Sequence, residues 1–138
     1  MLRLLYALAT GSWLGAVLCI SFVVTPAAHA SFPTPDARRF LRPIFPRFHS
    51  MGLACGVAAL TAVFLGRAGL ERGELLRLAL PVVVALAATT ASRELVTPRL
   101  QGLEGHTADF ERLHRVSTML HTTTLASLLL ALAAAVSR

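Results

Sequence analysis

The chain contains no lysine, only two cysteines and little charge of either sign. Charged residues make up 14% of its 138 residues, whereas soluble domains carry about 25%. Together with a mean hydropathy of +0.66, this deficit excludes an ordinary cytosolic fold. The thirteen arginines are spread between apolar blocks. That spacing favours lipid headgroups over nucleic acid as the anionic partner.

The recurrent motifs of catalytic and metal sites are missing as well. The chain has no Cys-x-x-Cys, no His-x-x-x-His, no glycine-rich phosphate loop and no nucleophile elbow. We therefore assign no catalytic residue and do not expect an enzyme. The two cysteines, Cys19 and Cys55, fall within apolar stretches, which disfavours a secreted protein held together by disulfides.

Four apolar stretches dominate the sequence, at about residues 2–24, 49–65, 75–96 and 116–136. A helix that crosses a hydrocarbon core of ~30 Å needs roughly 20 residues, and no stretch has the alternating pattern of a strand. The fold class we predict is all-α, a single-domain integral membrane bundle of four helices. A soluble bundle is disfavoured because its helices would need polar outer faces.

Four spans place both termini and the turn at 66–74 on one side of the membrane, which we call side A. The longer connections, 25–48 and 97–113, lie on the opposite side, side B. Eight of the thirteen arginines fall on side B, which favours a cytoplasmic side B. Arg3 at the start of the first span opposes this, so the orientation stays open. We expect a multi-pass protein of the bacterial inner (cytoplasmic) membrane.

The first span also imitates a secretory signal, because Ala28-His29-Ala30 matches a signal-peptidase site. However, the apolar run from Leu4 to Val24 has 21 residues, and the apolar cores of such signals have about 7–15. We therefore expect a retained span.

The first side-B connection has the pattern of a short helix that lies in the membrane interface. Thr34 is a candidate helix cap, with Pro35 in the first turn. Pro43 and Pro46 interrupt this helix before the second span. Apolar residues recur on one face, and the other face is basic and predicted to contact lipid headgroups: Arg38, Arg39, Arg42 and Arg47. The alternative is an ordinary positively charged loop.

Two Gly-x-x-x-Gly motifs fall in consecutive spans, Gly11 with Gly15 and Gly52 with Gly56. Small residues four apart let helix backbones approach closely, which drives association within lipid. The pair of motifs predicts that the first two spans pack on each other through these glycines.

All five histidines lie on side B or in its half of the membrane: His29, His49, His106, His114 and His121. An ionisable group inside the membrane is a functional candidate, because it is costly unless it faces protein or water. On the fourth span, His114, Ser117, His121 and Thr124 share one helical face, and His114 is the first candidate functional residue. His121 lies about 10 Å beyond His114. A metal ion on either one would therefore need a ligand from another helix.

Counting residues from the ends of the spans places Cys19, Cys55 and His121 at a similar depth. With His49 and His114, these are the candidate ligands for a haem or a metal ion. Thiolate and imidazole together suit copper, whereas imidazoles from two helices suit a haem iron. The alternative is structural, because small cysteines fit close helix contacts and a histidine between helices often hydrogen-bonds a carbonyl or hydroxyl.

Short motifs run along nearly the whole chain: Gly11-Ser12-Trp13-Leu14-Gly15, residues 21–26, residues 44–48, residues 97–99 and residues 110–117. Their order and spacing resemble the transmembrane-protein-205-like family of membrane proteins. The motif residues are Trp13, Gly15, Pro26, Phe45, Pro46, Pro98, Phe110, His114 and Ser117. The resemblance implies four spans without an assigned biochemical role. It also implies a distant similarity to the copper-resistance-D-like group, some of whose members handle haem or copper. The chain departs from the family pattern at Ser92 and His121, where the family commonly has asparagine, so a metal role for His121 would not be a family trait.

We therefore expect an accessory or structural subunit that packs in the bilayer as a homo-oligomer or within a larger complex. Two alternatives stay open. One is a haem- or copper-binding protein that uses the side-B histidines. The other is an oligomeric transporter element for small solutes, since four helices alone barely enclose a path.

Overall fold

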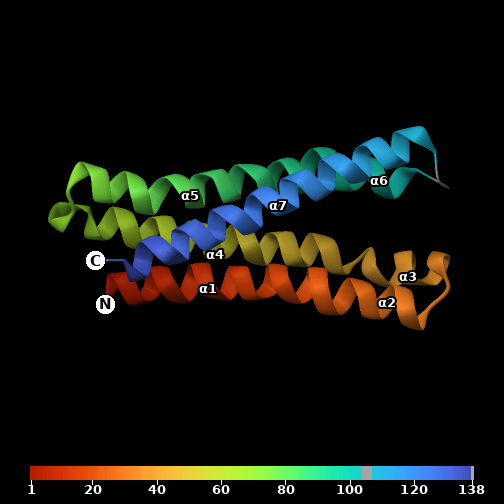
Figure 1. The fold of residues 1–138 in the computed structure, drawn as a ribbon, viewed down its shortest axis with the longest axis horizontal. Coiled ribbons are helices and arrows are strands. Elements are labelled where there is room, and N and C mark those ends of the chain that lie inside the picture. The colour runs from red at the N-terminus through yellow and green to blue at the C-terminus, as the bar shows by residue number, and fades with distance from the viewer. Residues whose placement is uncertain (104–106, 138) are drawn as a thin grey trace.

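The computed structural model of the chain describes residues 1–103 and 107–137. Four long helical segments run side by side, and the described residues contain no β-strand. The two ends of the chain lie at the same end of this bundle, as four spans require (Figure 1). In chain order the elements are α1 (Leu2–Cys19), η1 (Ile20–Val24), α2 (Thr25–Ser31), α3 (Thr34–Leu41), α4 (Ile44–Gly66), η2 (Arg67–Gly69), α5 (Arg72–Ala91), η3 (Ser92–Val96), α6 (Thr97–Gly102) and α7 (Ala108–Val136).

Four segments are long and apolar enough to cross a membrane: Leu2–Ser31, Thr34–Gly69, Arg72–Gly102 and Ala108–Val136. Each predicted span lies inside one of them. Large side chains such as Phe22, Val57 and Leu130 are more than half exposed on the outside of the bundle. Hydrocarbon is the solvent that suits such a surface, and the chain is therefore a multi-pass membrane protein with the all-α, four-helix fold that the sequence predicts.

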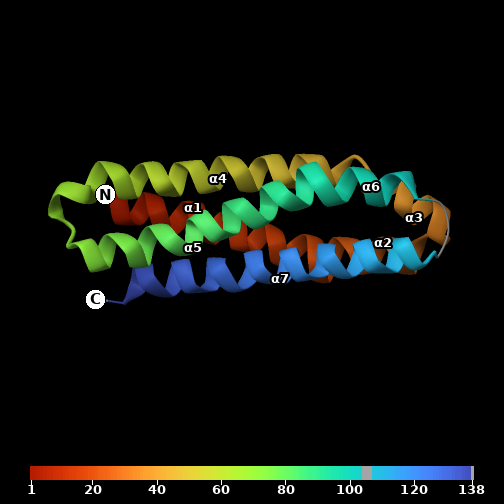
Figure 2. The same cartoon turned by 90° about the horizontal axis from the view of Figure 1, so that it is seen from above.

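The helices form a closed ring in which α1 packs on α4 and α7, and α5 packs on the same two helices. The most extensive contacts join α1 with α4 and α5 with α7. Figure 2 shows that the four long segments extend along the whole bundle and cross one another at small angles. Residues from all four helices therefore meet at each level along its axis.

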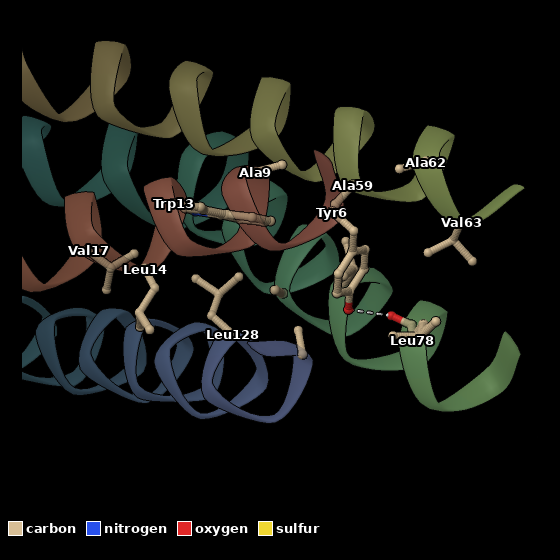
Figure 3. Packing of buried hydrophobic residues seen from close by; sticks show 13 residues of the cluster. Tyr6, Ala9, Trp13, Leu14, Val17, Ala59, Ala62, Val63, Leu78 and Leu128 are labelled. Atoms are coloured by element: carbon tan, nitrogen blue, oxygen red, sulfur yellow. Dashed lines mark hydrogen bonds between the residues drawn. The ribbon is translucent and has the colours of Figure 1, made fainter. Parts of the chain in front are cut away.

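The centre of the bundle is a dry layer of apolar side chains, which we call the apolar layer: Trp13, Val17, Ala59, Val82, Ala85 and Leu128. None of them is more than 1% exposed. Towards side A, the Tyr6 hydroxyl donates a hydrogen bond of 2.8 Å to the Leu78 carbonyl, which joins α1 to α5 (Figure 3). This layer separates the side-A half of the bundle from the side-B half.

The predicted glycine contact between the first two spans is half wrong. A Cβ built on Gly52 would lie 2.9 Å from Trp13 Cε2, and one on Gly56 would lie 2.8 Å from Trp13 Cζ3. A Cβ on Gly11 or Gly15 would meet nothing within 4 Å. The reason is helical geometry: Trp13 faces α4, and positions two residues away point to the opposite side of the helix. The two glycines of α4 therefore admit the indole ring, whereas those of α1 lie outside the contact.

Two short π-helical segments interrupt the first and third spans near side B. The Thr25 amide donates to the Ile20 carbonyl and the Thr97 amide to the Ser92 carbonyl, each five residues back. In both spans a proline comes next, Pro26 and Pro98. Proline has no N–H to donate and its ring crowds the preceding turn. A widened turn just before it relieves that crowding, and such turns often occur at functional sites.

The short helix predicted between the first two spans is present as α3. It lies across the side-B end of the bundle (Figure 2), where Ala37 and Leu41 are buried against Ala28. The predicted cap is wrong, because Thr34 is already the first helical residue and Pro33 precedes it without a side-chain hydrogen bond. By contrast, α7 has a side-chain cap, since the Thr107 hydroxyl accepts a bond of 3.2 Å from the Phe110 amide.

Candidate functional site

A layer of polar side chains lies one to two helical turns from the apolar layer, towards side B. All four long helical segments contribute to it, and we call it the polar layer: Ser21, His49, Thr89, Ser92, His121 and Thr124. His49, Thr89, Ser92 and Thr124 are buried, and the other two are half-buried. Buried polar groups need hydrogen-bond partners, so the partners of each side chain decide what the layer can bind.

The closest contact in the polar layer joins the first and last spans. Ser21 Oγ lies 2.5 Å from His121 Nε2 and 2.6 Å from the Val17 carbonyl oxygen. A hydroxyl has one proton, and the carbonyl can only accept. When the hydroxyl donates to Val17, it accepts the Nε2–H of His121. That arrangement fixes the tautomer of the imidazole and leaves the His121 Nδ1 lone pair free to bind a proton or an ion.

A second contact joins the third and fourth spans. Thr89 Oγ1 and Thr124 Oγ1 are 3.5 Å apart, and the Thr124 hydroxyl donates to the Leu120 carbonyl at 3.0 Å. The Thr124 oxygen is therefore left as an acceptor for Thr89. This weak bond holds α5 against α7 directly beside the His121 side chain.

His49, unlike His121, has a buried ring nitrogen without a hydrogen-bond partner. It is 5% exposed, and its Nδ1 is the one buried side-chain nitrogen or oxygen among the described residues that has no hydrogen-bond partner. Leaving a buried polar atom without a partner costs about 1–3 kcal/mol. An unpaired nitrogen at this position marks either strain or the binding point of a small species.

A small enclosed space lies between the two imidazoles. His49, His121, Thr89, Ser92 and Thr124 line it, with Phe48 and Leu120 as apolar walls. Its volume is about 10 Å³, close to the ~10–15 Å³ that one water needs. The Phe48 ring centroid lies 5.4 Å from that of His49 and 6.2 Å from that of His121. The site therefore accommodates one water or one ion between neutral donors.

Two serines of the polar layer belong to the π turns, and one of them, Ser92, lines this space. Ser21 lies in η1 and Ser92 lies in η3. A π turn holds an extra residue and rotates the subsequent residues about the helix axis. Both turns lie at the level of the polar layer.

His114, the first candidate from the sequence, lies outside the polar layer. It is exposed on α7 and stacks on Phe110 of the same helix, with ring centroids 6.0 Å apart. In the inner part of the helical face predicted for α7, Ser117 and His121 are half-buried and Thr124 is buried. His29 is also exposed, and His106 lies outside the described residues.

The predicted ligand set of Cys19, Cys55 and His121 does not come together. Cys19 is exposed on the outer surface, and Cys55 is half-buried against the core. Among the described residues no three His, Cys, Asp or Glu side chains gather as metal ligands would. Of the five candidate ligands, only His49 and His121 line one common space.

The basic residues predicted for lipid headgroups lie at the side-B end. The Arg38 guanidinium lies 4.7 Å from the centroid of the Phe110 ring, which anchors α3 to α7. Arg39, Arg42 and Arg47 are exposed. The Arg42 carbonyl accepts a bond of 3.5 Å from Gln101 of α6. Contact of these side chains with lipid stays a prediction.

An internal repeat in the sequence would have identified part of this site. Val-Thr-Pro occurs at 24–26 and again at 96–98, beginning at the last residue of each π turn, and Phe-x-Arg-x-His occurs at 45–49 and at 110–114. The repeat matches the ring of contacts, in which α1 with α4 corresponds to α5 with α7. It shows that Ser21 and Ser92 lie within equivalent turns. It also equates His49 with His114, of which only His49 is buried.

Comparison with known proteins gives a family without an assigned activity. A family model described as a domain of unknown function, DUF4149, matches residues 8–108, from within α1 to the first residue of α7. No curated protein and no solved structure matches the chain. The matched region contains Ser21, His49 and Ser92, whereas His121 lies beyond it. Since the match covers most of the chain, this protein belongs to the DUF4149 family.

Proposed function

We propose that the protein binds a single copper(I) ion inside the membrane, between His49 and His121. The observation that carries the proposal is the buried His49 Nδ1, which has no hydrogen-bond partner and belongs to a side chain that lines the same small space as the second imidazole. A bound ion supplies the partner that His49 lacks. Imidazole nitrogen is a suitable ligand for copper.

The hydrogen bonds of the site leave the His121 Nδ1 lone pair free for a metal ion. The contact of Ser21 with Val17 and His121 places the imidazole proton on His121 Nε2, and the lone pair on His121 Nδ1. Metal-bound histidines usually make such a bond through their second nitrogen, which orients the ring. Ser21 would therefore orient His121 rather than touch the ion.

The charge of the site favours a monovalent ion. The polar layer contains no carboxylate, and the nearest acidic side chain on α5 and η3, that of Glu94, is exposed and paired with Arg93 at 3.2 Å. Burying charge among neutral groups is costly, and the cost grows with the charge. Copper(I) carries one charge and accepts two nitrogen ligands, so it suits a pair of neutral imidazoles.

A haem does not fit this site. The enclosed space of about 10 Å³ holds one small species, and a porphyrin between the two rings would require the four helices to separate. We therefore propose no haem chemistry.

The proposal is tested by titrating detergent-purified protein with copper(I) under anaerobic conditions against a coloured copper(I) chelator. We expect one equivalent to bind to the wild type and none to His49→Ala or His121→Ala. His114→Ala is the matched control, because His114 is exposed two turns from His121 on the same helix; it should bind as the wild type does. Wild-type protein without bound copper, or equal losses in all three variants, would overturn the proposal.

The membrane we propose is the bacterial inner membrane. Proteins that span the outer membrane are β-barrels, whereas this chain consists of apolar helices. The resemblance to the transmembrane-protein-205-like family and, distantly, to the copper-resistance-D-like group stays a prediction. It does not support His121 as a copper ligand, because the family commonly has asparagine at that position.

The accessory role expected from the sequence also stays a proposal. It rests on an outer surface that is apolar around the bundle, which suits lipid, a second copy or a larger complex. Co-purification at fixed stoichiometry with another membrane protein would support it. Transport by one copy is disfavoured, because the apolar layer closes the path between the polar layer and side A.

A further inference from the structure

A hollow much larger than the space at the polar layer lies towards the opposite end of the bundle. It has a volume of about 570 Å³ and opens at side A. Its wall includes residues of all four long helical segments, among them Leu2, Tyr6, Ala62, Leu78, Ala134 and Ala135. Pockets of about 300–1,000 Å³ hold small-molecule ligands. We call this space the side-A hollow.

Small residues keep the side-A hollow open. Ala62 and Gly66 line it from α4, and Ala134 and Ala135 line it from α7. Leucine is common at neighbouring positions of α7. The side-A hollow is therefore open because alanines occupy the positions that line it, and not because α7 is poor in large side chains. Interiors are otherwise packed to high density, and an empty space of this size would forfeit many contacts.

The wall of the side-A hollow suits an apolar occupant. Its one buried hydroxyl, that of Tyr6, already donates to the Leu78 carbonyl at 2.8 Å (Figure 3). The phenol therefore offers no further proton to a ligand. The remaining wall consists mainly of aliphatic side chains, against which water would find few partners.

A cation stands at the mouth. Arg3 lines the hollow and is 57% exposed, and one nitrogen of its guanidinium, Nη2, pairs with Glu74 of α5. A guanidinium has five N–H donors, so Arg3 can hold Glu74 and an anionic oxygen together. Phosphate oxygens match the planar donors of arginine.

We infer that the side-A hollow binds one membrane phospholipid, with its phosphate at Arg3 and the adjoining hydrocarbon in the hollow. The position decides between ligands, because the hollow lies where the apolar spans end and the charged residues of side A begin. At that level of a bilayer, phosphate and hydrocarbon meet. The phospholipid would fill the space that the four helix ends leave open, independently of any ion at the polar layer.

The test is native mass spectrometry of delipidated protein titrated with palmitoyl-oleoyl phosphatidylglycerol. We expect the wild type to bind one lipid molecule. Ala134→Phe should bind none, because the phenyl ring occupies the hollow. Ala133→Phe is the matched control, since Ala133 is the exposed neighbour on α7; it should retain the lipid. Ala135→Leu is a second variant that fills the hollow with a smaller side chain. Lipid binding is compared only among variants that keep the wild-type melting temperature.

The position of the phosphate is tested separately. Arg3→Gln should weaken lipid binding about fivefold, the effect of one basic side chain at an anionic membrane surface. Arg67→Gln, which removes an exposed arginine from the same side, should change it little. A wild type that retains no lipid, or a filled variant that still binds it, would overturn the inference. Equal effects of the two arginine substitutions would contradict the phosphate position.

Discussion

The apolar layer and the polar layer use the same four helices but fill the space between them differently. Around the apolar layer, large rings and aliphatic side chains interlock, and Trp13 lies against two glycines of α4. In the polar layer, hydroxyls and imidazoles face one another across a space for one water or ion, and one nitrogen has no partner. The first region maximises packing, whereas the second retains an unfavourable group. A membrane bundle gains nothing in stability from such a group, which is the physical reason to assign it a function.

The largest effect should come from removing the indole ring of the apolar layer. Trp13 is 1% exposed and touches both packing glycines, so Trp13→Ala should lower the free energy of unfolding by about 3–5 kcal/mol. Denaturation with sodium dodecyl sulfate in mixed micelles measures this change. Phe22→Ala, on an outer position 69% exposed, is the control and should change stability by less than ~1 kcal/mol. Similar losses of unfolding free energy in both variants would mean that the apolar layer does not contribute more to stability than the outer surface does.

Substituting glycine by alanine should change the free energy of unfolding in opposite directions in α4 and in α1. Gly52→Ala adds a methyl group against the buried Trp13 ring, and we expect a loss of about 1–3 kcal/mol. Gly15→Ala adds the same group where nothing lies within 4 Å, and it should stabilise the helix by up to ~1 kcal/mol. Chemical denaturation of both variants decides the point. Destabilisation by the Gly15 substitution would show that α1 uses this face in a contact.

In the polar layer, Ser21→Ala should affect binding far more than stability. Losing a residue that orients a metal ligand weakens metal affinity about 10–100-fold, whereas the hydrogen bond itself contributes only about 0.5–1.5 kcal/mol to folding. The measurement is the copper(I) competition titration. Ser50→Ala is the matched control, because the Ser50 hydroxyl binds the Pro46 carbonyl on an exposed face. Unchanged copper affinity in Ser21→Ala would remove Ser21 from the site.

The fold was predictable from the sequence because hydrocarbon leaves few alternatives. A spanning segment must satisfy its own backbone, so four apolar stretches of sufficient length already predict four helices. The short helix α3 was predictable for a related reason, since the alternation of basic and apolar residues after Pro35 has a helical period. Only its first residue was misjudged, where Pro33 and Thr34 both suit a helix start.

The site was predicted only in part, because apolar residues surround these helices on every side. Without a polar outer face, the sequence does not reveal that Gly52 and Gly56 point inward while Gly11 and Gly15 do not. The same ambiguity made exposed His114 look as promising as buried His49. The π turns add a second difficulty, since the residues that follow them are rotated out of the regular helical repeat. His49 and His121 were among the candidates, but that their imidazoles line one common space could be seen only from the fold.

The most direct test of the polar layer is the melting temperature of wild type and His49→Phe in detergent, each with and without copper(I). Phenylalanine removes the unpaired nitrogen while retaining a ring, so metal-free His49→Phe should be more stable than metal-free wild type by about 1–3 kcal/mol. Copper(I) should then raise the melting temperature of the wild type alone, because only a species that binds the folded state stabilises it. A metal-free His49→Phe that melts below the wild type, together with a wild type indifferent to copper(I), would contradict a copper site in the polar layer.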